Sequence, residues 1–321
     1  MISEGITHPE KLMFPADGIT KGDLAAYYAS VARVMLPHLR DRPLTMERFP
    51  QGIDKKGFIQ KDVSKGFPEW LARVTVPKHG GVVHHPLIDD ARSLEWMANQ
   101  NCITPHVWNR RATDLDRPDI CVFDLDPSEE DPVALREAAL AVRDALEGHG
   151  LRSWVKTSGS KGFHIVVPIG GDAAVMDVAH FALGVAEALV ARFPDRFTLE
   201  FSKVDRGHRI LVDIGRNGYS ATFAAAYAVR PKPGAPVSAP CTWEEVASGA
   251  VGPQSFTLRT MAARLDAVGG DLWADLHAAP APLPPGSDAP SPSGQRVTSR
   301  GVRGPSKAKK PRAGKPRTPG A

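Results

Sequence analysis

The chain has 321 residues, 42% of them hydrophobic, which is enough for a substantial core in one large domain or two small ones. Nine of its 40 Lys and Arg residues follow position 295, so the net charge of +4 hides a remainder with 31 basic and 36 acidic residues. Three scattered cysteines argue against a disulfide framework or a cysteine zinc site, and no apolar run approaches the roughly 18 residues of a membrane span, which together favour a cytoplasmic protein.

The first predicted helix covers residues 21–39, where apolar side chains recur at helical spacing after Thr20, a suitable N-cap. His8, Lys11 and Lys21 lie before this helix or at its start, where amide groups and the helix dipole favour an anion. These three residues predict a site for a terminal phosphate. Taken singly, the two lysines are better explained as solvated surface.

An aromatic residue stands among lysines in the segment Phe58-Ile59-Gln60-Lys61, which follows Lys55 and Lys56. An aromatic ring can stack on an unpaired base while nearby cations hold the nucleic-acid backbone. The segment therefore predicts a contact with an unpaired nucleic-acid strand through Phe58 and Lys61. A core position for Phe58 is an equally good explanation of the same pattern.

A strand is predicted at residues 119–125, and the run Phe123-Asp124-Leu125-Asp126 places two carboxylates at its end. Because side chains alternate along a strand, Asp124 and Asp126 point to the same face. Two carboxylates this close repel, so a divalent cation with hard oxygen ligands, Mg²⁺ or Mn²⁺, is the natural occupant. A helix is predicted directly afterwards, from Asp131 to about Gly148.

A glycine-rich turn, Thr157-Ser158-Gly159-Ser160-Lys161-Gly162-Phe163-His164, lies between predicted strands at 151–157 and 163–168. Glycines allow backbone amides to approach phosphate oxygens, and Ser158, Lys161 and His164 add a hydroxyl, a cation and an imidazole. The turn predicts a triphosphate site, although its spacing is not that of a Walker loop. A plain hairpin turn with an incidental lysine explains it about as well when its neighbours are ignored.

A third helix is predicted at about 173–193, followed by strands at 198–202 and 209–214. Asp213 ends the last of these strands and is the best third carboxylate for the pair at 124 and 126, unless it only caps its strand. Three carboxylates can hold two divalent ions, which clamp the attacking and leaving oxygens of a phosphoryl transfer. Four arginines with a guanidinium fork suited to phosphate surround Asp213 in the sequence: Arg206, Arg209, Arg216 and Arg230.

The order of helices and strands predicts an α+β fold of mixed or antiparallel sheets flanked by helices, rather than a doubly wound sheet. We expect one domain at 1–278, with phosphate and template contacts in its N-terminal part and the metal and nucleotide site in its centre. After about Ala278 the composition changes to Pro, Ser, Gly, Lys and Arg, so 279–321 is predicted to be a disordered basic tail that binds polyanions or only links domains.

Together, these motifs resemble the polymerase domain of bacterial DNA ligase D, a member of the archaeo-eukaryotic primase superfamily that acts in non-homologous end joining. The resemblance runs from about His8 to Leu276. Its most specific elements are Phe123–Pro127, Ser158–His164, Ile210–Asp213, and Val229–Ser238 followed by Thr242-Trp243. Several separate motifs in the right order make the resemblance specific.

The resemblance implies template-directed addition of NTPs or dNTPs at DNA ends and gaps, a preference for ribonucleotides, and two Mn²⁺ or Mg²⁺ ions. It implies nucleoid association and two partners, the Ku end-binding protein and an ATP-dependent DNA ligase. It also implies a role for each motif. The metal ligands and catalytic residues would be Asp124, Asp126 and Asp213; the nucleotide contacts Ser158, Lys161, His164, His106, Arg206, Arg216 and Arg230; the 5′-phosphate contacts His8, Lys11 and Lys21; and the template contacts Phe58 and Lys61.

Two positions depart from the family pattern. Phe58-Ile59 replaces two adjacent aromatics, and His8 stands where relatives commonly carry Asn, so both affect substrate choice more than chemistry. The chain also lacks the Lys-x-Asp-Gly motif of an ATP-dependent ligase, which predicts a stand-alone polymerase domain or one expressed apart from its ligase. Two alternatives stay open at this point: a haloacid-dehalogenase-type phosphohydrolase, suggested by Phe-Asp-Leu-Asp, and a non-catalytic module that binds DNA ends.

Overall fold

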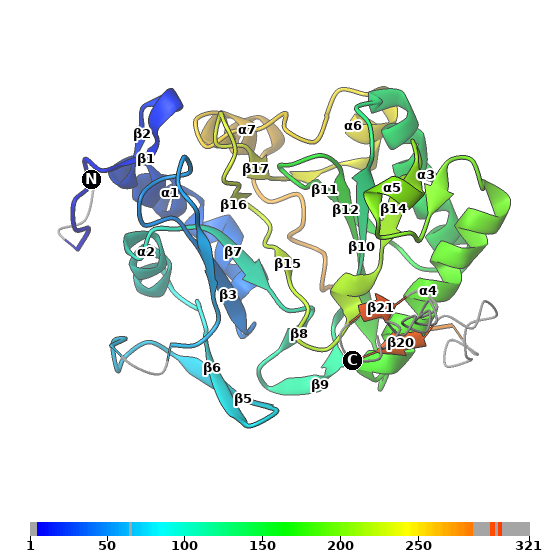
Figure 1. Cartoon of the computed structure of the whole chain (residues 1–321), viewed down its shortest axis with the longest axis horizontal. Helices are drawn as coiled ribbons and strands as arrows, with labels where there is room; N and C mark the ends of the chain where they lie inside the picture. The colour runs from blue at the N-terminus through cyan, green and yellow to red at the C-terminus, as the bar shows by residue number, and fades with distance from the viewer. Residues whose placement is uncertain (1–4, 64–65, 285–295, 299–300, 304–321) are drawn as a thin grey trace, which may run out of the picture.

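The computed structural model describes residues 5–63, 66–284, 296–298 and 301–303, whose elements form two packed halves with strands running between them (Figure 1). None of the helices in these ranges has the length and apolar character needed to cross a bilayer. The helices are α1 (Lys21–Leu39), α2 (Ala91–Asn99), α3 (Pro132–Gly148), α4 (Val175–Arg192), α5 (Lys203–Arg206), α6 (Trp243–Ser248) and α7 (Met261–Val268), with two 3₁₀ turns, η1 (Pro15–Asp17) and η2 (Gly215–Asn217).

The larger sheet has seven strands in the order β13-β14-β10-β12-β11-β18, with β19 joined to the end of β12. Two pairs, β13–β14 and β12–β19, are parallel, and the others are antiparallel. This mixed sheet confirms the predicted α+β class. Its strands are β10 (Ile120–Pro127), β11 (Trp154–Thr157), β12 (Phe163–Gly170), β13 (Phe197–Thr198), β14 (Ile210–Asp213), β18 (Pro240–Cys241) and β19 (Ala281–Pro282).

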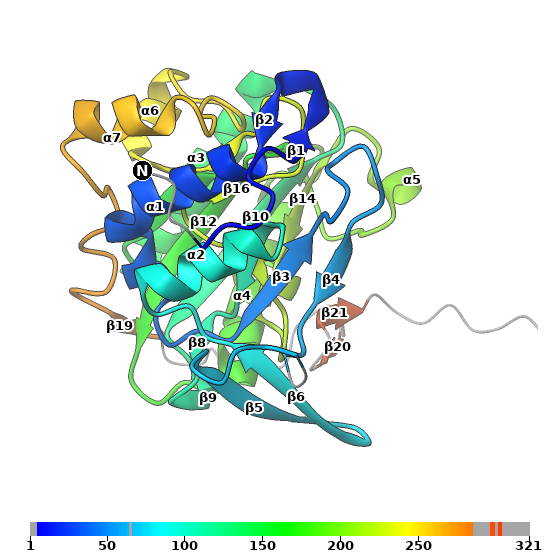
Figure 2. The ribbon, with the colours of Figure 1, turned by 90° about the vertical axis from the view of Figure 1, so that its left-hand side faces the viewer.

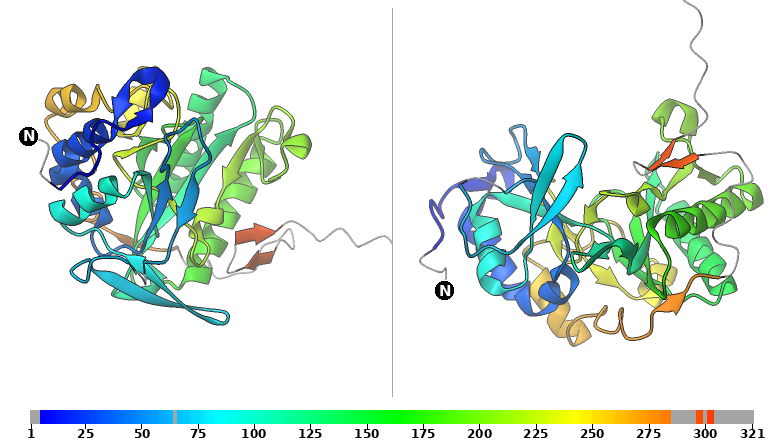
Figure 3. Two further views of the ribbon diagram at one scale, coloured as in Figure 1. Left: turned by 60° about the vertical axis from the view of Figure 1, so that its left-hand side comes forward. Right: turned by 90° about the horizontal axis from the view of Figure 1, so that it is seen from below.

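A second sheet of four strands, in the order β15-β7-β3-β4, belongs to the other half of the molecule. It consists of β3 (Leu44–Arg48), β4 (Phe58–Gln60), β7 (Cys102–Val107) and β15 (Phe223–Ala224). The remaining strands form two-stranded pairs: β1 (Leu12–Phe14) with β2 (Ile19–Thr20), β5 (Arg73–Lys78) with β6 (Gly81–Pro86), β8 (Arg110–Arg111) with β9 (Asp114–Pro118), β16 (Ala228–Val229) with β17 (Val237–Ser238), and β20 (Arg296–Thr298) with β21 (Gly301–Arg303). The β5–β6 hairpin projects away from the body in Figures 2 and 3.

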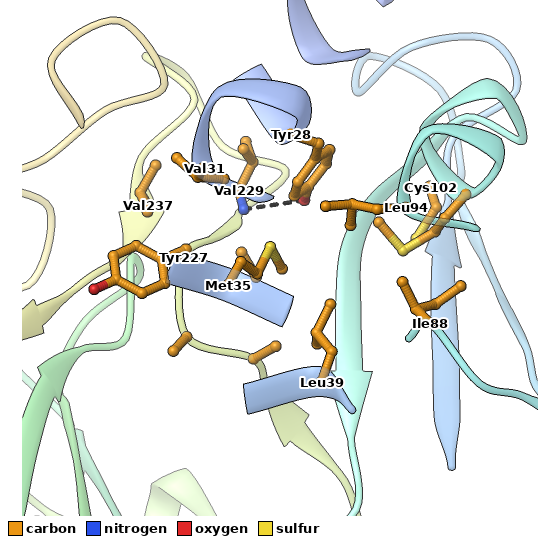
Figure 4. Packing of buried hydrophobic residues seen from close by; sticks show 14 of the residues in the cluster. Tyr28, Val31, Met35, Leu39, Ile88, Leu94, Cys102, Tyr227, Val229 and Val237 are labelled. Carbon is orange, nitrogen blue, oxygen red and sulfur yellow. Dashed lines mark hydrogen bonds between the residues drawn. The ribbon is translucent and has the colours of Figure 1, made fainter. Parts of the chain in front are cut away.

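Two hydrophobic cores lie on opposite faces of the larger sheet. One fills the space between this sheet and helices α3 and α4, and includes Phe123, Leu125, Val142 and Ile165. The other joins Val122 and Val166 on the opposite face to α1 and the second sheet. Figure 4 shows part of this second core, where the backbone N–H of Val229 donates to the Tyr28 hydroxyl oxygen at 3.3 Å. This face is therefore covered by the half of the molecule that contains α1 and the four-stranded sheet, called the N-terminal half below.

Local capping explains where the predicted helices begin. Thr20 Oγ1 accepts from the N–H of Asp23 at 3.1 Å, and the Asp23 carboxylate accepts from the N–H of Thr20 at 2.8 Å, so α1 starts at Lys21 as predicted. Asp131 caps α3 through the N–H groups of Val133 and Ala134. Helix α4 and strands β10, β12 and β14 also confirm the predicted elements within a few residues.

Two predicted strands are shorter than the sequence suggested. The prediction at 151–157 was too long, because the N–H of Leu151 donates to the carbonyl of Leu146 and so still belongs to the end of α3; β11 begins at Trp154. The prediction at 198–202 was wrong after Thr198, since Thr198 Oγ1 accepts from the N–H of Glu200 and turns the chain out of the sheet. An exposed loop with α5 follows instead.

The predicted boundary at 278 was too early. Strand β19 pairs in parallel with Ile169 and Gly170 of β12, so the folded domain continues past 278. Backbone pairing recurs between β20 and β21, a short hairpin that lies near α4 in Figure 1. The prediction of disorder was therefore wrong for these segments. The remainder of the predicted tail, at 285–295, 299–300 and 304–321, lies outside the described residues.

Candidate active site

Three carboxylates meet on the face of the larger sheet that is turned toward the N-terminal half. Asp124 and Asp126 alternate with buried residues of β10, and Asp124 is the direct cross-strand partner of Asp213 on β14. Opposite residues of an antiparallel pair share one face of the sheet. The predicted common face of Asp124 and Asp126 and the choice of Asp213 as the third carboxylate therefore fit the strand register.

Two arginines bind these carboxylates. Arg216 of η2 bridges two strands, because its Nε lies 3.2 Å from Asp124 Oδ2 and its Nη2 lies 3.0 Å from Asp213 Oδ2. Arg206 of α5 lies with its Nη1 3.1 Å from Asp126 Oδ2. Both arginines were predicted as nucleotide contacts, and both lie beside the carboxylates. A cavity of about 370 Å³ opens next to Asp213 and Arg216.

Asp124 and Asp213 face opposite electrostatic environments although they are neighbours. Burial by itself raises the pKa of Asp124, but His164, Arg216 and Lys156 together hold that pKa well below its usual range. Burial raises the pKa of Asp213, and the two other carboxylates add to this, against the opposing effect of Arg216. One member of the pair is thus stabilised as a carboxylate and the other is not.

The donor set fits a hard divalent cation, because all three candidate ligands are carboxylates that converge from two adjacent strands. Their oxygens already bind Arg206 and Arg216. Accordingly, in the described part of the chain no three acidic, His or Cys side chains are already arranged around a metal position. A metal bound by all three carboxylates would compete with these arginines for the Oδ2 atoms.

The glycine-rich turn connects β11 to β12 as predicted and lies against the strand of the carboxylates. Ser158 Oγ accepts from the N–H groups of Ser160 and Gly162, both at 3.1 Å, which closes the turn. A Cβ on Gly162 would lie only 1.7 Å from the carbonyl oxygen of Leu125, between the two aspartates of β10. Glycine at 162 therefore allows the turn and the carboxylate strand to touch.

Side chains around the turn divide between two places. Arg230 Nη1 donates to the carbonyl of Ser158 at 3.2 Å, which brings its guanidinium to the turn. Lys161 is exposed and lines a different cavity, of about 410 Å³, together with Lys232 and Gln254. Among the predicted phosphate contacts, Arg216 thus lines the cavity beside Asp213, whereas Lys161 lines the other cavity.

His164 connects the turn to the carboxylates. It pairs directly with Asp124 across the β10–β12 ladder, and its Nε2 lies 3.3 Å from Asp124 Oδ1. Its Nδ1 lies 2.7 Å from Lys156 Nζ. Burial and the nearby Lys156 lower the pKa of His164 to about 4, against the opposing effect of Asp124.

The second sheet supplies the opposite wall through His106. On β7, His106 lies across from Ala224 of β15, and its Nε2 is 3.0 Å from Glu47 Oε2. Burial raises the pKa of Glu47, but the hydrogen bond from His106 and the charge of Arg230 give it a net lowered value. The neighbouring Phe223 ring lies 6.0 Å from the His164 ring, centroid to centroid. His106 therefore lies on the strand next to Phe223, which faces His164.

The predicted 5′-phosphate contacts lie together but are not equally accessible. His8 is exposed and adopts a positive φ of 50°. Lys11 is partly exposed, and its carbonyl accepts the N–H of Lys21 at 2.7 Å. Lys21 is only 3% exposed, because its Nζ donates to the carbonyl of Thr7 at 2.7 Å. The structure thus presents His8 and Lys11 at the surface and holds Lys21 inside.

The predicted template contacts lie on strand β4 at the edge of the second sheet. Phe58 and Ile59 are 46% and 54% exposed, which excludes the core position for Phe58. The Arg48 guanidinium lies 5.3 Å from the centre of the Phe58 ring. Lys61, directly after the strand, is exposed. This edge therefore combines an exposed aromatic with cations, as the sequence predicted.

Sequence reasoning missed Glu47, Lys156 and Asn217. Asn217 is fully buried and binds both backbone groups of Val122, which fixes η2 and its Arg216 against β10. Lys156 stands in a run of strand-forming residues, where a lysine is normally read as exposed. The available signal was the strand register, which places Lys156 opposite His164. Glu47 carried no comparable signal.

Known proteins resemble this chain over most of its length. The multifunctional non-homologous end joining DNA repair protein LigD of Mycobacterium tuberculosis is 36% identical over 266 residues, which are 78% of this chain and 34% of that protein. The bifunctional non-homologous end joining protein LigD of Bacillus subtilis is 29% identical over 261 residues, 81% of this chain and 42% of that protein. The chain therefore spans about a third of the length of the mycobacterial relative.

A solved structure described as the polymerase domain from Mycobacterium tuberculosis ligase D in complex with DNA matches this fold with a TM-score of 0.80 at 35% identity. The match covers 87% of this chain and 100% of that chain. The family described as LigD, primase-polymerase domain, matches residues 20–273. The chain therefore belongs to the LigD primase-polymerase domain family.

Proposed function

We propose that the protein is a template-directed nucleotidyltransferase, a primase-polymerase that fills gaps and extends 3′ ends at DNA double-strand breaks in non-homologous end joining. The observation that carries this proposal is the register of β10, β12 and β14, which brings Asp124, Asp213 and His164 together on one face. Carboxylates beside a phosphate-binding turn are the arrangement that nucleotide addition requires.

In this proposal Asp124, Asp126 and Asp213 hold two Mn²⁺ or Mg²⁺ ions. The ions, when bound, activate the 3′ hydroxyl and neutralise charge on the transferred phosphate and the leaving group. The protein's own groups orient the nucleotide. Arg216 and Arg206 are released from the carboxylates and become donors for phosphate oxygens, and Arg230 and the amides of the turn bind the triphosphate from the other side. Ser158, Lys161, His164 and His106 complete the proposed nucleotide contacts.

DNA is proposed to cross the edge of the second sheet. Phe58 stacks on the template and Lys61 holds its backbone, while His8 and Lys11 bind the 5′-phosphate on the far side of a gap. Lys21 supports that site from inside, since burial and then the nearby charge of Lys11 lower the pKa of Lys21. The exposed positions of Phe58 and Lys61 support this assignment.

Ribonucleotide preference, Mn²⁺ dependence, nucleoid association, and work with Ku and an ATP-dependent ligase are further parts of the proposal. Their support is the similarity to LigD proteins that are named as multifunctional or bifunctional end-joining proteins. A non-catalytic DNA-end binding module is the second candidate, favoured by one observation: arginines occupy all three carboxylates. The phosphohydrolase alternative is dropped, because the family and the mixed sheet are those of a primase-polymerase.

The deciding experiment is primer extension on a gapped duplex, with and without a 5′-phosphate at the downstream edge. Ribo- or deoxynucleotides are supplied with Mn²⁺ or Mg²⁺, and an Asp124→Asn/Asp126→Asn variant serves as the control. We expect phosphate-stimulated addition that prefers ribonucleotides and Mn²⁺ and that the variant lacks. If the protein binds the DNA and adds no nucleotide under any condition, the binding module replaces the polymerase.

A further inference from the structure

Lys156 is a buried lysine on the active-site face of the larger sheet, and the proposed mechanism gives it no role. It lies in the middle of β11, its side chain is fully buried, and it is the cross-strand partner of His164. A buried lysine is costly unless its polar group is bonded. Lys156 Nζ contacts two side chains, the His164 imidazole and the Ser238 hydroxyl.

Ser238, Lys156, His164 and Asp124 form a row of hydrogen bonds, and the groups at its two ends fix which atom donates in each bond. Ser238 Oγ donates its only proton to the carbonyl of Thr157 at 2.8 Å, so it must accept from Lys156 Nζ. At the other end, a carboxylate oxygen accepts, and Asp124 Oδ1 lies 3.3 Å from His164 Nε2, so this facing nitrogen carries the proton. A neutral imidazole with Nε2–H has an acceptor at Nδ1, and Lys156 is the donor to it.

A charged Lys156 has no acceptor, so Nδ1 must accept from it. Burial and the nearby Arg230 lower the pKa of Lys156, and a neutral amine keeps two N–H groups, one for each partner, so it can make the same two bonds. The Phe223 ring closes the remaining side, with its centre 5.7 Å from Nζ. The His164 ring is therefore held on one edge by Lys156 and left with a single N–H that faces the carboxylates.

We propose that Lys156 is a positioning residue that fixes the orientation and tautomer of His164, so that its Nε2–H is presented to the carboxylate and nucleotide site. Lys156 touches neither the substrate nor a proposed metal ligand and acts only through His164. The inference deepens the proposed function and rests on it for its catalytic consequence. The geometry of the His164 ring is testable without any catalytic assay.

The first test measures the ring itself. Two-bond ¹H–¹⁵N correlation spectra of metal-free protein labelled at histidine report which ring nitrogen is protonated. The signals of His164 are assigned as the set that disappears in a His164→Gln variant. We expect wild-type His164 to be protonated at Nε2 with a hydrogen-bonded Nδ1, and Lys156→Met to shift the Nδ1 signal. Protonation at Nδ1 in the wild type overturns the proposal, whether or not Lys156→Met folds.

The second test is a double-mutant cycle in single-nucleotide addition. Lys156→Met should lower kcat/KM by about 10- to 100-fold, the usual effect of losing a partner that orients a functional side chain. In a His164→Ala background, the same change should have almost no further effect. Val155→Ala, a buried change on the opposite face of β11, controls for lost stability and should leave the His164 signals in place.

The outcomes separate the two claims. Independent, multiplying losses for Lys156→Met and His164→Ala, or a Val155→Ala effect of equal size, would show that Lys156 has only a structural role. If Lys156→Met does not fold, Lys156→Gln is used, which keeps a donor and should retain most activity. Failure of the wild type to add nucleotides removes the proposed function, while the ring spectra still decide the orientation of His164.

Discussion

The proposed chemical site and the proposed DNA contacts lie on two different kinds of backbone. Asp124 and His164 belong to central strands that are paired on both sides, so ladder hydrogen bonds fix their positions. Phe58 lies on β4, an edge strand, and His8 lies in a turn with a positive φ. Groups that must meet within a few ångströms are thus held in the middle of a sheet, while groups that select the DNA lie where sequence can change at little cost.

The same contrast exists on a smaller scale inside the site, between the cross-strand neighbours Asp124 and Asp213. The surroundings lower the pKa of Asp124 and raise that of Asp213. A carboxylate whose pKa is lowered in the folded protein stabilises the fold at pH values above its unfolded pKa, near 3.8, and this stabilisation is lost as the pH falls through the folded pKa. A carboxylate whose pKa is raised has the opposite effect, because its ionisation destabilises the fold as the pH rises.

The largest expected effect comes from breaking this pair one residue at a time. Asp124→Asn and Asp213→Asn should each reduce nucleotide addition by about two orders of magnitude or more, because each removes a proposed metal ligand. In metal-free buffer at pH 7, however, Asp124→Asn should lower the melting temperature and Asp213→Asn should raise it. Thermal unfolding in EDTA measures this. Shifts of the same sign would contradict the electrostatic contrast between the two residues.

The next effect concerns the edge strand. Phe58→Ala should weaken template binding by about 1–3 kcal/mol, the typical value of one stacked base, and should leave the melting temperature unchanged because the ring is exposed. Ile59→Ala removes a comparably exposed side chain that points to the other side of the strand and serves as the control. Fluorescence anisotropy on a single-stranded overhang checks the prediction, and equal losses for the two variants would refute specific stacking.

A smaller effect is expected at the 5′-phosphate site, where the two lysines should differ. Lys11→Ala should remove most of the stimulation by a downstream 5′-phosphate and leave extension of a simple recessed end nearly unchanged. Lys21→Met should mainly lower stability, because its ammonium binds Thr7 inside the protein. The ratio of rates on phosphorylated and unphosphorylated gaps gives the answer. A larger change in that ratio for Lys21→Met than for Lys11→Ala would reverse the assignment.

The smallest effect is expected from the C-terminal charges. Deletion of 304–321 removes six Lys and Arg residues and should reduce DNA affinity at low salt by releasing fewer counterions, with little change at higher salt. Titrations at several salt concentrations give the slope of log affinity against log salt. A loss of affinity that stays constant across salt would indicate a specific partner contact in this segment instead.

The sequence was most informative where local patterns decide the structure. Alternation along β10 predicted the common face of Asp124 and Asp126, and capping residues predicted the starts of α1 and α3. The sequence could not show that Arg206 binds Asp126 or that Arg216 binds Asp124, because these contacts join segments 80 and 92 residues apart. The burial of Lys21 was missed because a lysine at the start of a helix is normally exposed, and only the packed structure places its ammonium against Thr7. Strand β19 was missed for the same reason, since its short Pro- and Ala-rich segment gains order only from pairing with β12.

Gly162 has a consequence for reading new members of this family. The space between it and the Leu125 carbonyl leaves no room for even a methyl group, and the backbone of a central strand cannot move aside. A chain that keeps every aspartate and carries any other residue at this position would still look intact by its acidic residues. Its glycine-rich turn and its carboxylate strand would nevertheless be forced apart. Glycine at position 162 is therefore a stricter sign of an intact site than the acidic residues alone.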